Sequence, residues 1–207
     1  LSVSAGFLSM LPVSMIAIDE AHCISQWGHD FRPEYAQLKS LRSIFPKVPI
    51  IALTATADKT TRKDIVQQFA PSEPKLYVSS FDRPNFYISV RSNVKEKDKI
   101  EEIVSFIKSH VEESGIIYCL SRKGTEALAA TLIQSGIQAA FYHAGMSSAE
   151  RSNIQEKFIY DDVKIICATI AFGMGIDKSN GRWVMHYNLP RGIEGYYQGI
   201  GRAGRDG

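Results

Sequence analysis

The fold of this chain is decided by Ile16-Ala17-Ile18-Asp19-Glu20-Ala21-His22, an apolar run that ends in two adjacent carboxylates and a histidine. A short apolar run of this kind is typical of a strand buried in a parallel sheet. Open parallel sheets bind their ligands at the carboxyl ends of the strands, where Asp19 and Glu20 lie. In nucleotide hydrolases one such carboxylate holds Mg²⁺ and a second orients the attacking water. The alternative is a strand end with solvated charges.

Composition sets broad limits on the kind of protein. The 207 residues are 44% hydrophobic, which suits one large or two small globular domains. The formal net charge is only +2, so a nucleic-acid surface would need local placement of basic residues. The cysteines at 23, 119 and 167 lack metal-binding spacing, so we expect buried thiols in a reducing compartment. No apolar stretch approaches the length of a membrane span, and we expect no membrane partner.

Apolar periodicity predicts strands and helices that alternate along the chain. This alternation indicates an α/β fold, in which parallel sheets carry helices on both faces. The connector 81–85 contains Pro84, which resists helix together with the residue before it, and we place a domain boundary after Arg83. The expected strands are 16–18, 48–53, 76–80, 115–119, 139–143, 164–168 and 182–187, and the expected helices are 33–45, 59–69, 100–107, 125–135, 147–158 and 193–207.

Several motifs follow one another in a characteristic order. They are D-E-A-H-C-I-S-Q-W-G-H-D-F-R-P-E-Y (19–35), L-T-A-T-A-D (53–58), S-S-F-D-R-P-N (79–85), G-I-I-Y-C (115–119), Y-H-A-G-M (142–146), A-T-I-A-F-G-M-G-I-D-K (168–178) and Y-Y-Q-G-I-G-R-A-G-R-D-G (196–207). Together they closely resemble the RecQ family of DNA helicases within superfamily 2. The resemblance implies two RecA-like lobes, with ATP in the cleft and single-stranded DNA across both lobes. Residues 1–83 would be the carboxyl-terminal part of a first, incomplete lobe, and 84–207 a second lobe truncated at its last motif.

The resemblance assigns roles to the residues around the first motif. Asp19 would hold Mg²⁺ through water, Glu20 would be the catalytic carboxylate, and His22 would couple their site to the rest of the lobe. In the segment from Gln26 to Arg32, Trp27 and Phe31 can stack on bases. His29 and Arg32 can approach phosphates, and by resemblance this aromatic-rich loop, Gln26 included, reports DNA to the ATPase. The alternative is a core Trp and Phe beneath a helix start.

Polar residues also follow the other predicted strands. Thr54 and Thr56 would couple hydrolysis to unwinding by resemblance, although threonines at strand ends are often only turn formers. In the second lobe, side chains or adjacent amides would contact DNA phosphates by resemblance, and the alternative for them is an ordinary solvated loop. These second-lobe residues are Ser121, Arg122, His143 and Thr169.

The last two motifs supply candidate nucleotide contacts. By resemblance Gly175, Asp177 and Gln198 belong to the nucleotide site, with Asp177 at the ribose, although an acid after glycines is also typical of a turn. Arg202 and Arg205 lie three apart and would share one helix face with Gln198. Arginine fingers on a γ-phosphate raise hydrolysis rates by about 10³-fold or more. We expect Arg205 to be the closer partner; the alternative is a pair of surface or DNA-phosphate arginines.

Glycine patterns separate this chain from other nucleotide-binding proteins. No Gly-Lys dipeptide occurs, so the phosphate-cradling G-x-x-x-x-G-K-S/T loop is absent, and we expect a piece of a longer protein. The G-x-G-x-x-G at 199–204 follows a helical pattern instead of a strand, so it does not predict a dinucleotide site. Gly199 stands where the family usually carries Glu. A glycine inside a helix costs roughly 1 kcal/mol, so we expect a looser helix before the two arginines.

The expected function is an ATP-dependent DNA helicase of RecQ type, moving 3′ to 5′ on single-stranded DNA in DNA repair and recombination. The expected cofactors are ATP and Mg²⁺, with zinc only in a family region outside this chain. The expected partners are single-stranded and forked DNA. Localisation would be cytoplasmic in a bacterium and nuclear in a eukaryote. The alternatives are a non-catalytic DNA-binding module and another superfamily 2 helicase acting on RNA.

Overall fold

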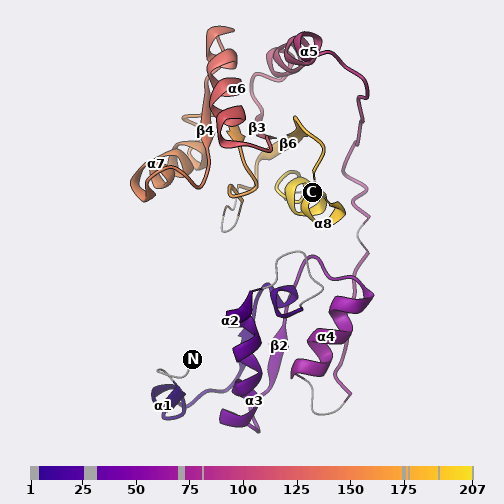
Figure 1. Cartoon of the computed structure of the whole chain (residues 1–207), viewed down its shortest axis with the longest axis vertical. Helices are drawn as coiled ribbons and strands as arrows, with labels where there is room; N and C mark the ends of the chain where they lie inside the picture. Colours follow the sequence, from indigo (N-terminus) through magenta and orange to yellow (C-terminus); the bar gives the residue numbers. More distant parts are fainter. Residues whose placement is uncertain are drawn as a thin grey trace. The chain divides into compact units, whose positions relative to one another are not determined.

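The computed structural model describes residues 5–25, 32–69, 73–80, 82–173, 176, 178–190 and 192–206. The chain divides into two compact units, Leu1–Ser80 (unit 1) and Phe81–Gly207 (unit 2), which Figure 1 colours from indigo to yellow along the sequence. The sequence placed the boundary after Arg83, close to this division. No helix within the described ranges is long and apolar enough to cross a membrane.

Unit 2 is built on a four-stranded parallel sheet with the strand order β4-β5-β3-β6. The strands are β3 (Ser114–Tyr118), β4 (Ala139–Tyr142), β5 (Ile165–Ala168) and β6 (Gly181–His186). The two central strands, β3 and β5, are buried along their whole length, because both faces of this sheet are covered. The α/β class with parallel sheets, predicted from the alternation, is confirmed here.

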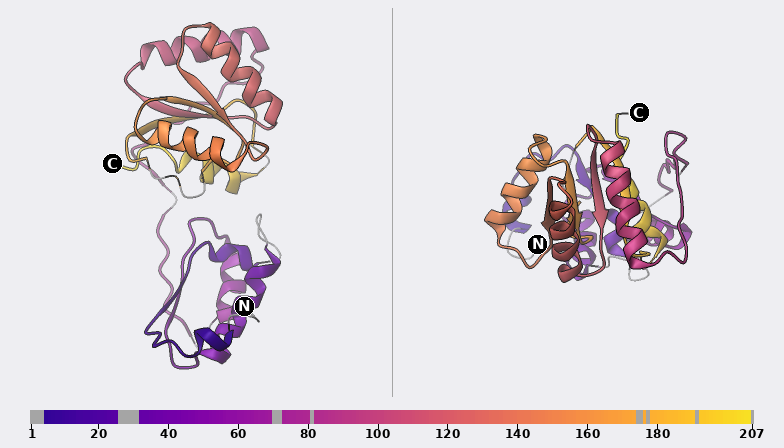
Figure 2. Two further views of the ribbon diagram at one scale, coloured as in Figure 1. Left: turned by 90° about the vertical axis from the view of Figure 1, so that its left-hand side faces the viewer. Right: turned by 90° about the horizontal axis from the view of Figure 1, so that it is seen from above.

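Helices cover both faces of that sheet (Figure 2). The pair α5 (Glu96–Ser109) and α6 (Arg122–Gln134) lies on one face, and α7 (Ser148–Ile159) and α8 (Ile193–Ile200) lie on the other. Side chains alternate along each strand, so neighbouring residues belong to different cores. Ile117 packs with α5 and α6, whereas Ile116 packs with α7.

Local signals explain where the helices of unit 2 begin and end. The hydroxyl of Ser121 accepts a hydrogen bond from the Gly124 amide at 3.0 Å and caps α6. Ser147 and Glu150 form a capping box at the start of α7. Gly136 ends α6 with a φ of 79°, a conformation in which glycine carries no steric penalty, as the sequence predicted.

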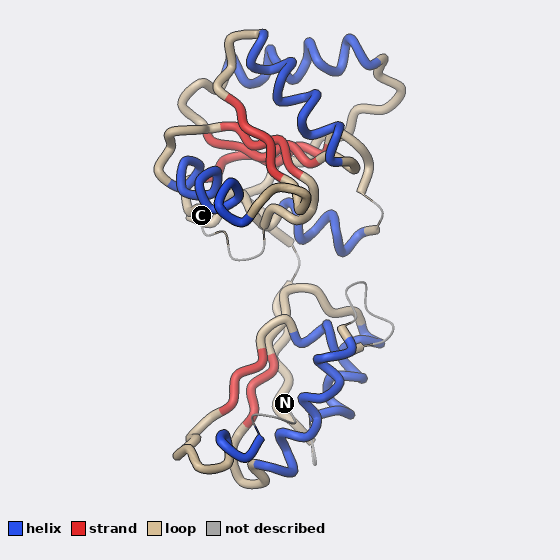
Figure 3. Tube along the Cα trace, turned by 60° about the vertical axis from the view of Figure 1, so that its left-hand side comes forward, coloured by secondary structure: helices blue, strands red, loops and turns tan. Residues whose placement is uncertain are grey.

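Unit 1 contains the two parallel strands β1 (Ile16–Ile18) and β2 (Ile50–Ala52), which are red in the lower part of Figure 3. The core packs one face of these strands against short helical turns. The helical segments are α1 (Ala5–Leu8), η1 (Ala21–Ile24), α2 (Pro33–Ala36), η2 (Gln37–Ser40), α3 (Leu41–Ile44) and α4 (Lys59–Phe69). The side chain of Asp58 accepts a hydrogen bond from the Thr61 amide at 2.7 Å and caps α4, which confirms the predicted start.

Two expectations about the elements are wrong, and a third is right in extent but differs in helix geometry. The segment 76–80 is not a strand: Leu76 and Tyr77 are exposed, and the strand pairings among the described residues do not include it. The helix expected over 33–45 is present as a continuous helical stretch over 33–44, in which the middle turn η2 has 3-10 geometry. The last helix ends at Ile200 and not near the chain end, because the glycines that follow have poor helix propensity and Gly204 adopts a φ of 57°.

Candidate functional site

The two adjacent carboxylates lie directly after β1, where the chain is held against the end of β2. Leu53 donates its amide hydrogen to the Ile18 carbonyl at 2.8 Å, and Ala21 donates to the Leu53 carbonyl at 2.9 Å. Asp19 is exposed and its Oδ1 accepts the Glu20 amide at 2.8 Å. Glu20 has a φ of 50°, in the left-handed region that costs a non-glycine residue about 1 kcal/mol or more. Both acids are thus presented to solvent at the carboxyl end of a parallel strand.

His22 connects these carboxylates to the second strand. The ring is 2% exposed, and its Nδ1 lies 2.9 Å from the Thr54 hydroxyl and 3.4 Å from a Glu20 carboxylate oxygen. Thr54 also hydrogen-bonds both the amide and the carbonyl of Thr56 at 3.2 Å. The D-E-A-H and T-A-T motifs, which lie more than thirty residues apart, therefore form one contact network. Such a network is what coupling between a hydrolytic site and the rest of a lobe requires.

Further contacts hold the chain on both sides of the aromatic-rich loop. Gln26, Trp27, His29 and Phe31 lie outside the described residues. Before the loop, the Ser25 hydroxyl donates to Asp64 of α4 at 2.6 Å; after it, the Arg32 amide donates to the Cys23 carbonyl at 2.9 Å. Arg32 itself is partly buried at the start of α2.

Two residues of this site were missed from the sequence. Asp64 was hidden in the helix after the second motif, and Tyr35, whose hydroxyl donates to the Asp19 carbonyl at 3.3 Å, was assigned to an apolar stripe. No motif or spacing in the sequence predicts a hydrogen-bonding role for either residue. Their contacts depend on how α4 and α2 pack against η1, which periodicity does not encode.

In unit 2 the predicted phosphate contacts gather at one edge of the sheet. Ser121 and Arg122 follow β3, His143 follows β4 and Thr169 follows β5, and parallel strands bring their carboxyl ends to the same edge. Ser121 and Arg122 are exposed, while Thr169 is partly buried and its amide donates to the Tyr142 carbonyl at 3.1 Å. Contact with DNA stays a prediction for all of them.

His143 has a different environment from its neighbours at this edge. Its Nε2 lies 2.8 Å from a Glu126 carboxylate oxygen, and its Nδ1 accepts the Gly145 amide at 3.2 Å. This pairing assigns the ring proton to Nε2. With 6% exposure, the ring ties α6 to the loop after β4. A Cβ at Gly145 would lie 2.9 Å from a guanidinium nitrogen of Arg122, so that cation crosses directly over the same loop.

The two arginines of the last motif lie in unlike environments. Both arginines follow the end of α8 at Ile200, so they do not share a helix face with Gln198 as the sequence predicted. Arg202 is partly buried near Tyr118, and a Cβ at Gly173 would come within 3.0 Å of its Nε. Burial raises the pKa of Tyr118 to about 12, and the neighbouring Arg202 partly opposes that rise. Arg205 is exposed, and its Nε donates to the Gly201 carbonyl at 3.3 Å. The sequence predicts Arg205 as the closer partner of a phosphate, and that role stays a prediction.

The segment after α8 is held by residues from both ends of unit 2. Arg83 and Asn85 donate to the Gly204 carbonyl at 2.9 and 3.0 Å, so the S-S-F-D-R-P-N motif does more than connect the units. Arg182 pairs with Asp206 at 2.8 Å. Gln198 is partly buried on α8, and Gly175 and Asp177 lie outside the described residues.

The carboxylates fit a magnesium ion held through water better than a metal held by several side chains. In the part of the chain that the structure describes, no group of three or more His, Cys, Asp and Glu side chains could bind a metal ion. Asp19 is exposed with one of its oxygens engaged by the backbone, which leaves the other available to a hydrated cation. Cys23, Cys119 and Cys167 are buried thiols that form no disulfide, and their burial was expected.

Comparison with known proteins identifies the family. The family described as the helicase conserved C-terminal domain matches residues 98–207, which is more than half of the chain. The chain belongs to this helicase family. The DEAD/DEAH box helicase family also matches, over residues 5–65.

Helicase relatives match almost the whole chain. It is 53% identical over 200 residues to the ATP-dependent DNA helicase RecQ of Pasteurella multocida, covering 96% of this chain and 31% of the relative. It is 48% identical over 196 residues to the RecQ-like DNA helicase BLM of Xenopus laevis, covering 94% of this chain and 14% of the relative. The chain thus spans about a third or less of the length of these relatives. The resemblance to the RecQ family, predicted from the motifs, is confirmed.

Solved helicase structures share the fold. The Saccharomyces cerevisiae protein Dbp5, bound to RNA and ADP BeF3, superposes with a TM-score of 0.75 at 21% identity, covering 93% of this chain and 50% of that one. At this identity the likeness concerns the fold alone. It confirms the RecA-like α/β architecture that the motifs implied for this helicase chain.

Proposed function

We propose that the protein containing this chain is an ATP-dependent DNA helicase of RecQ type. The observation that carries the proposal is the contact of His22 with Thr54 at 2.9 Å, which joins the strand-end carboxylates to the T-A-T motif. A motor needs such a connection, because hydrolysis performs work only when the hydrolytic site is coupled to the parts that move. The names of the two RecQ-type relatives support DNA as the nucleic acid.

The nucleotide chemistry is assigned to residues of known surroundings. Asp19 would hold Mg²⁺ through water, and the ion when bound would neutralise charge on the phosphates. Glu20, 43% exposed at the strand end, would orient the attacking water and accept its proton. The exposed Arg205 would contact a phosphate, and the partly buried Arg202 near Tyr118 would support the segment that carries it.

Nucleic-acid binding is assigned to the polar strand ends and to the aromatic-rich loop. Exposed Arg122 and Ser121 are suited to phosphate contacts, since positively charged and hydroxyl side chains bind the backbone without reading sequence. His143, already paired with Glu126, would position this edge instead of contacting DNA itself. Single-stranded and forked DNA, 3′ to 5′ movement, and a role in repair and recombination complete the proposal.

An RNA helicase is the second candidate, because the structural neighbour Dbp5 is bound to RNA. A DNA-binding module without turnover is the third. The chain lacks the G-x-x-x-x-G-K-S/T loop, so the 207 residues alone would not turn over ATP in the manner of the family.

The test is ATP turnover by the chain extended upstream through a phosphate-binding loop, with single-stranded DNA or RNA of equal length. We expect stimulation by DNA and a loss of about 10²–10⁴-fold in Glu20→Gln, the range associated with general acid–base catalysis. The matched control is Glu73→Gln, an exposed carboxylate of the same unit, which should retain full turnover. Equal stimulation by RNA would favour the second candidate. DNA binding without turnover would leave only the third.

A further inference from the structure

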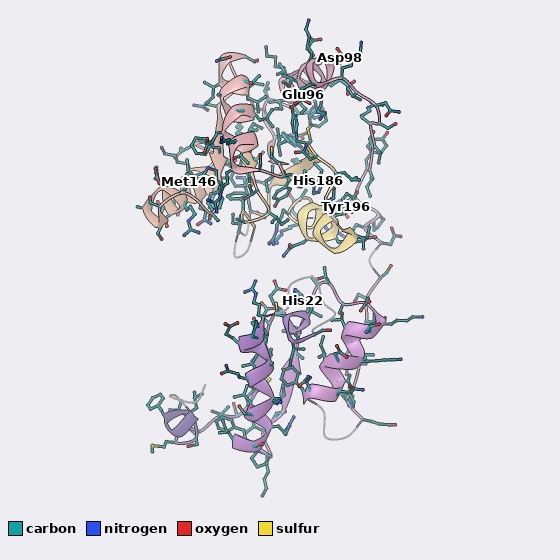
Figure 4. The ribbon with its side chains drawn as sticks, viewed as in Figure 1. His22, Glu96, Asp98, Met146, His186 and Tyr196 are labelled. Carbon is teal, nitrogen blue, oxygen red and sulfur yellow. The ribbon has the colours of Figure 1, made fainter. Side chains whose placement is uncertain are left out.

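The imidazole of His186 lies between the sheet of unit 2 and α8. His186 is the last residue of β6, and its ring centroid is 5.5 Å from that of Tyr118 on β3 and 5.5 Å from that of Tyr196 on α8. Figure 4 shows His186 and Tyr196 as neighbours at this end of the sheet. The ring therefore separates the helix that carries the last motif from the strands beneath it.

The backbone of α8 rests on this ring at Gly199. A Cβ at position 199 would fall 2.9 Å from both Cε1 and Nε2 of His186, closer than real Cβ contacts come. The shortfall from ordinary contact, which begins near 3.4 Å, is about half an ångström. Gly195 lies one turn earlier in the same helix, and a Cβ there would meet no atom within 4 Å. Of the two glycines in α8, only Gly199 lies too close to another side chain to carry a Cβ.

Hydrogen bonding does not account for the placement of His186. Its Nε2 is buried and has no hydrogen-bond partner among the described residues. His22 and His143, in contrast, each have close polar partners for the ring. Burial lowers the pKa of His186, so the ring is neutral in neutral solution. Its contribution is therefore the thickness and shape of a flat ring packed between Tyr118 and α8.

The helix that rests on His186 leads directly into the segment with the arginines assigned to phosphate chemistry. Gln198 precedes Gly199, and Arg202 follows the end of the helix, where it is partly buried near Tyr118. Beyond the helix, the Gly204 amide donates to the Gly181 carbonyl at 2.9 Å. This bond holds the segment beyond the helix, whereas the His186 ring contacts the helix itself at Gly199.

We infer that His186 is a positioning residue that sets the distance of α8 from the sheet, and that Gly199 allows the helix backbone to pack directly on the His186 ring. The inference rests on the proposed function in one respect, namely that the segment following α8 presents arginines to a phosphate. It gives the departure at Gly199 a packing reason in place of the looser helix expected from the sequence.

The two explanations predict opposite effects of adding one methyl group. If Gly199 only loosens the helix, Gly199→Ala and Gly195→Ala should both rigidify α8 and behave alike, because alanine is the better helix former. If the His186 ring instead sets the spacing of α8, the new methyl group of Gly199→Ala pushes the helix outward by about half an ångström. A displacement of 1 Å can cost about 10²-fold in rate, so this one should lower kcat by about 10-fold.

The experiment compares Gly199→Ala, Gly195→Ala, His186→Ala and the double variant Gly199→Ala/His186→Ala in the upstream-extended chain. The readouts are kcat and KM for ATP with single-stranded DNA, and thermal unfolding. We expect kcat about 10-fold lower in Gly199→Ala with KM changed less than about 3-fold, and Gly195→Ala within about 2-fold of the parent. In the double variant, removal of the ring should raise kcat above that of Gly199→Ala.

Two results would overturn the inference. One is equal behaviour of the two alanine variants; the other is a double variant whose losses are the product of the single losses, since residues in contact should couple. If the unsubstituted protein does not hydrolyse ATP, the proposed function fails and thermal unfolding decides. In that case the inference requires that the change in Tm of the double variant differ from the sum of the changes in Gly199→Ala and His186→Ala.

Discussion

Replacement of Gly115 by alanine should destabilise unit 2 strongly, because Trp183 occupies the space of the missing side chain. Gly115 on β3 is the register partner of Trp183 on β6. A Cβ at 115 would lie 2.2 to 2.4 Å from three indole atoms, more than 1 Å inside ordinary contact. The indole is 9% exposed and packs edge-on to Phe106 at 5.4 Å, so it has little room to turn aside.

The magnitude follows from the rigidity of the surroundings. β3 is hydrogen-bonded to strands on both sides, so its backbone yields little. Adding a methyl group to a packed core typically costs about 1–3 kcal/mol, and more when nothing moves. Alanine recovers about 0.4–1 kcal/mol by restricting the unfolded chain. We therefore expect a net loss of about 2 kcal/mol, which for a unit of this size lowers Tm by roughly 8 °C.

The assay is thermal unfolding followed by tryptophan fluorescence and circular dichroism. Gly195→Ala is the control, because its new methyl group meets open space. A second variant, Trp183→Leu, is unstable by itself for loss of packing, but adding Gly115→Ala to it should cost much less than in the parent. A Gly115→Ala protein that melts within about 2 °C of the parent would refute the overlap argument.

Two further predictions concern polar contacts. Thr54→Val should lower the free energy of unfolding by about 1–2 kcal/mol, because the buried His22 ring loses its hydroxyl partner at 2.9 Å; urea titration measures this loss. In the upstream-extended chain, DNA-stimulated ATP turnover should fall more than basal turnover. Asp161→Asn should flatten the acid-unfolding curve, because the buried Lys178 ammonium at 2.7 Å lowers the pKa of Asp161 to about 2. The unfolded carboxyl takes up its proton near pH 4, so the stabilisation is present above that pH and is lost as pH falls towards 2; an unchanged curve would contradict this.

Much of unit 2 could be predicted from the sequence. Its strands read as continuous apolar runs and its helices have polar caps, and such local signals survive packing because both faces of the sheet are buried. Unit 1 was less predictable. The segment 76–80 has apolar residues suited to a strand, yet it joins neither of the sheets formed by the described residues, and a strand is defined by its place in a sheet.

The candidate site was predictable in its residues and not in its contacts. Motif order identified Asp19, Glu20, His22 and Thr54, and the rule for parallel sheets placed each of them at a strand end. The pairing of His22 with Thr54 could not be read from either motif alone. It depends on the register of β1 against β2, which aligns Ile16 with Ile50.

The sequence by itself determined the alternation of strands and helices, the family, and the edge of each sheet on which chemistry-bearing residues lie, because periodicity and motif order are local properties of a chain. Only the tertiary structure decided that Gly199 seats α8 on His186, that Gly115 makes room for Trp183, and that Arg83 holds the last motif through the Gly204 carbonyl. Each of these contacts joins residues far apart in the chain. Their fit depends on strand register and helix spacing to within an ångström, which no local pattern carries.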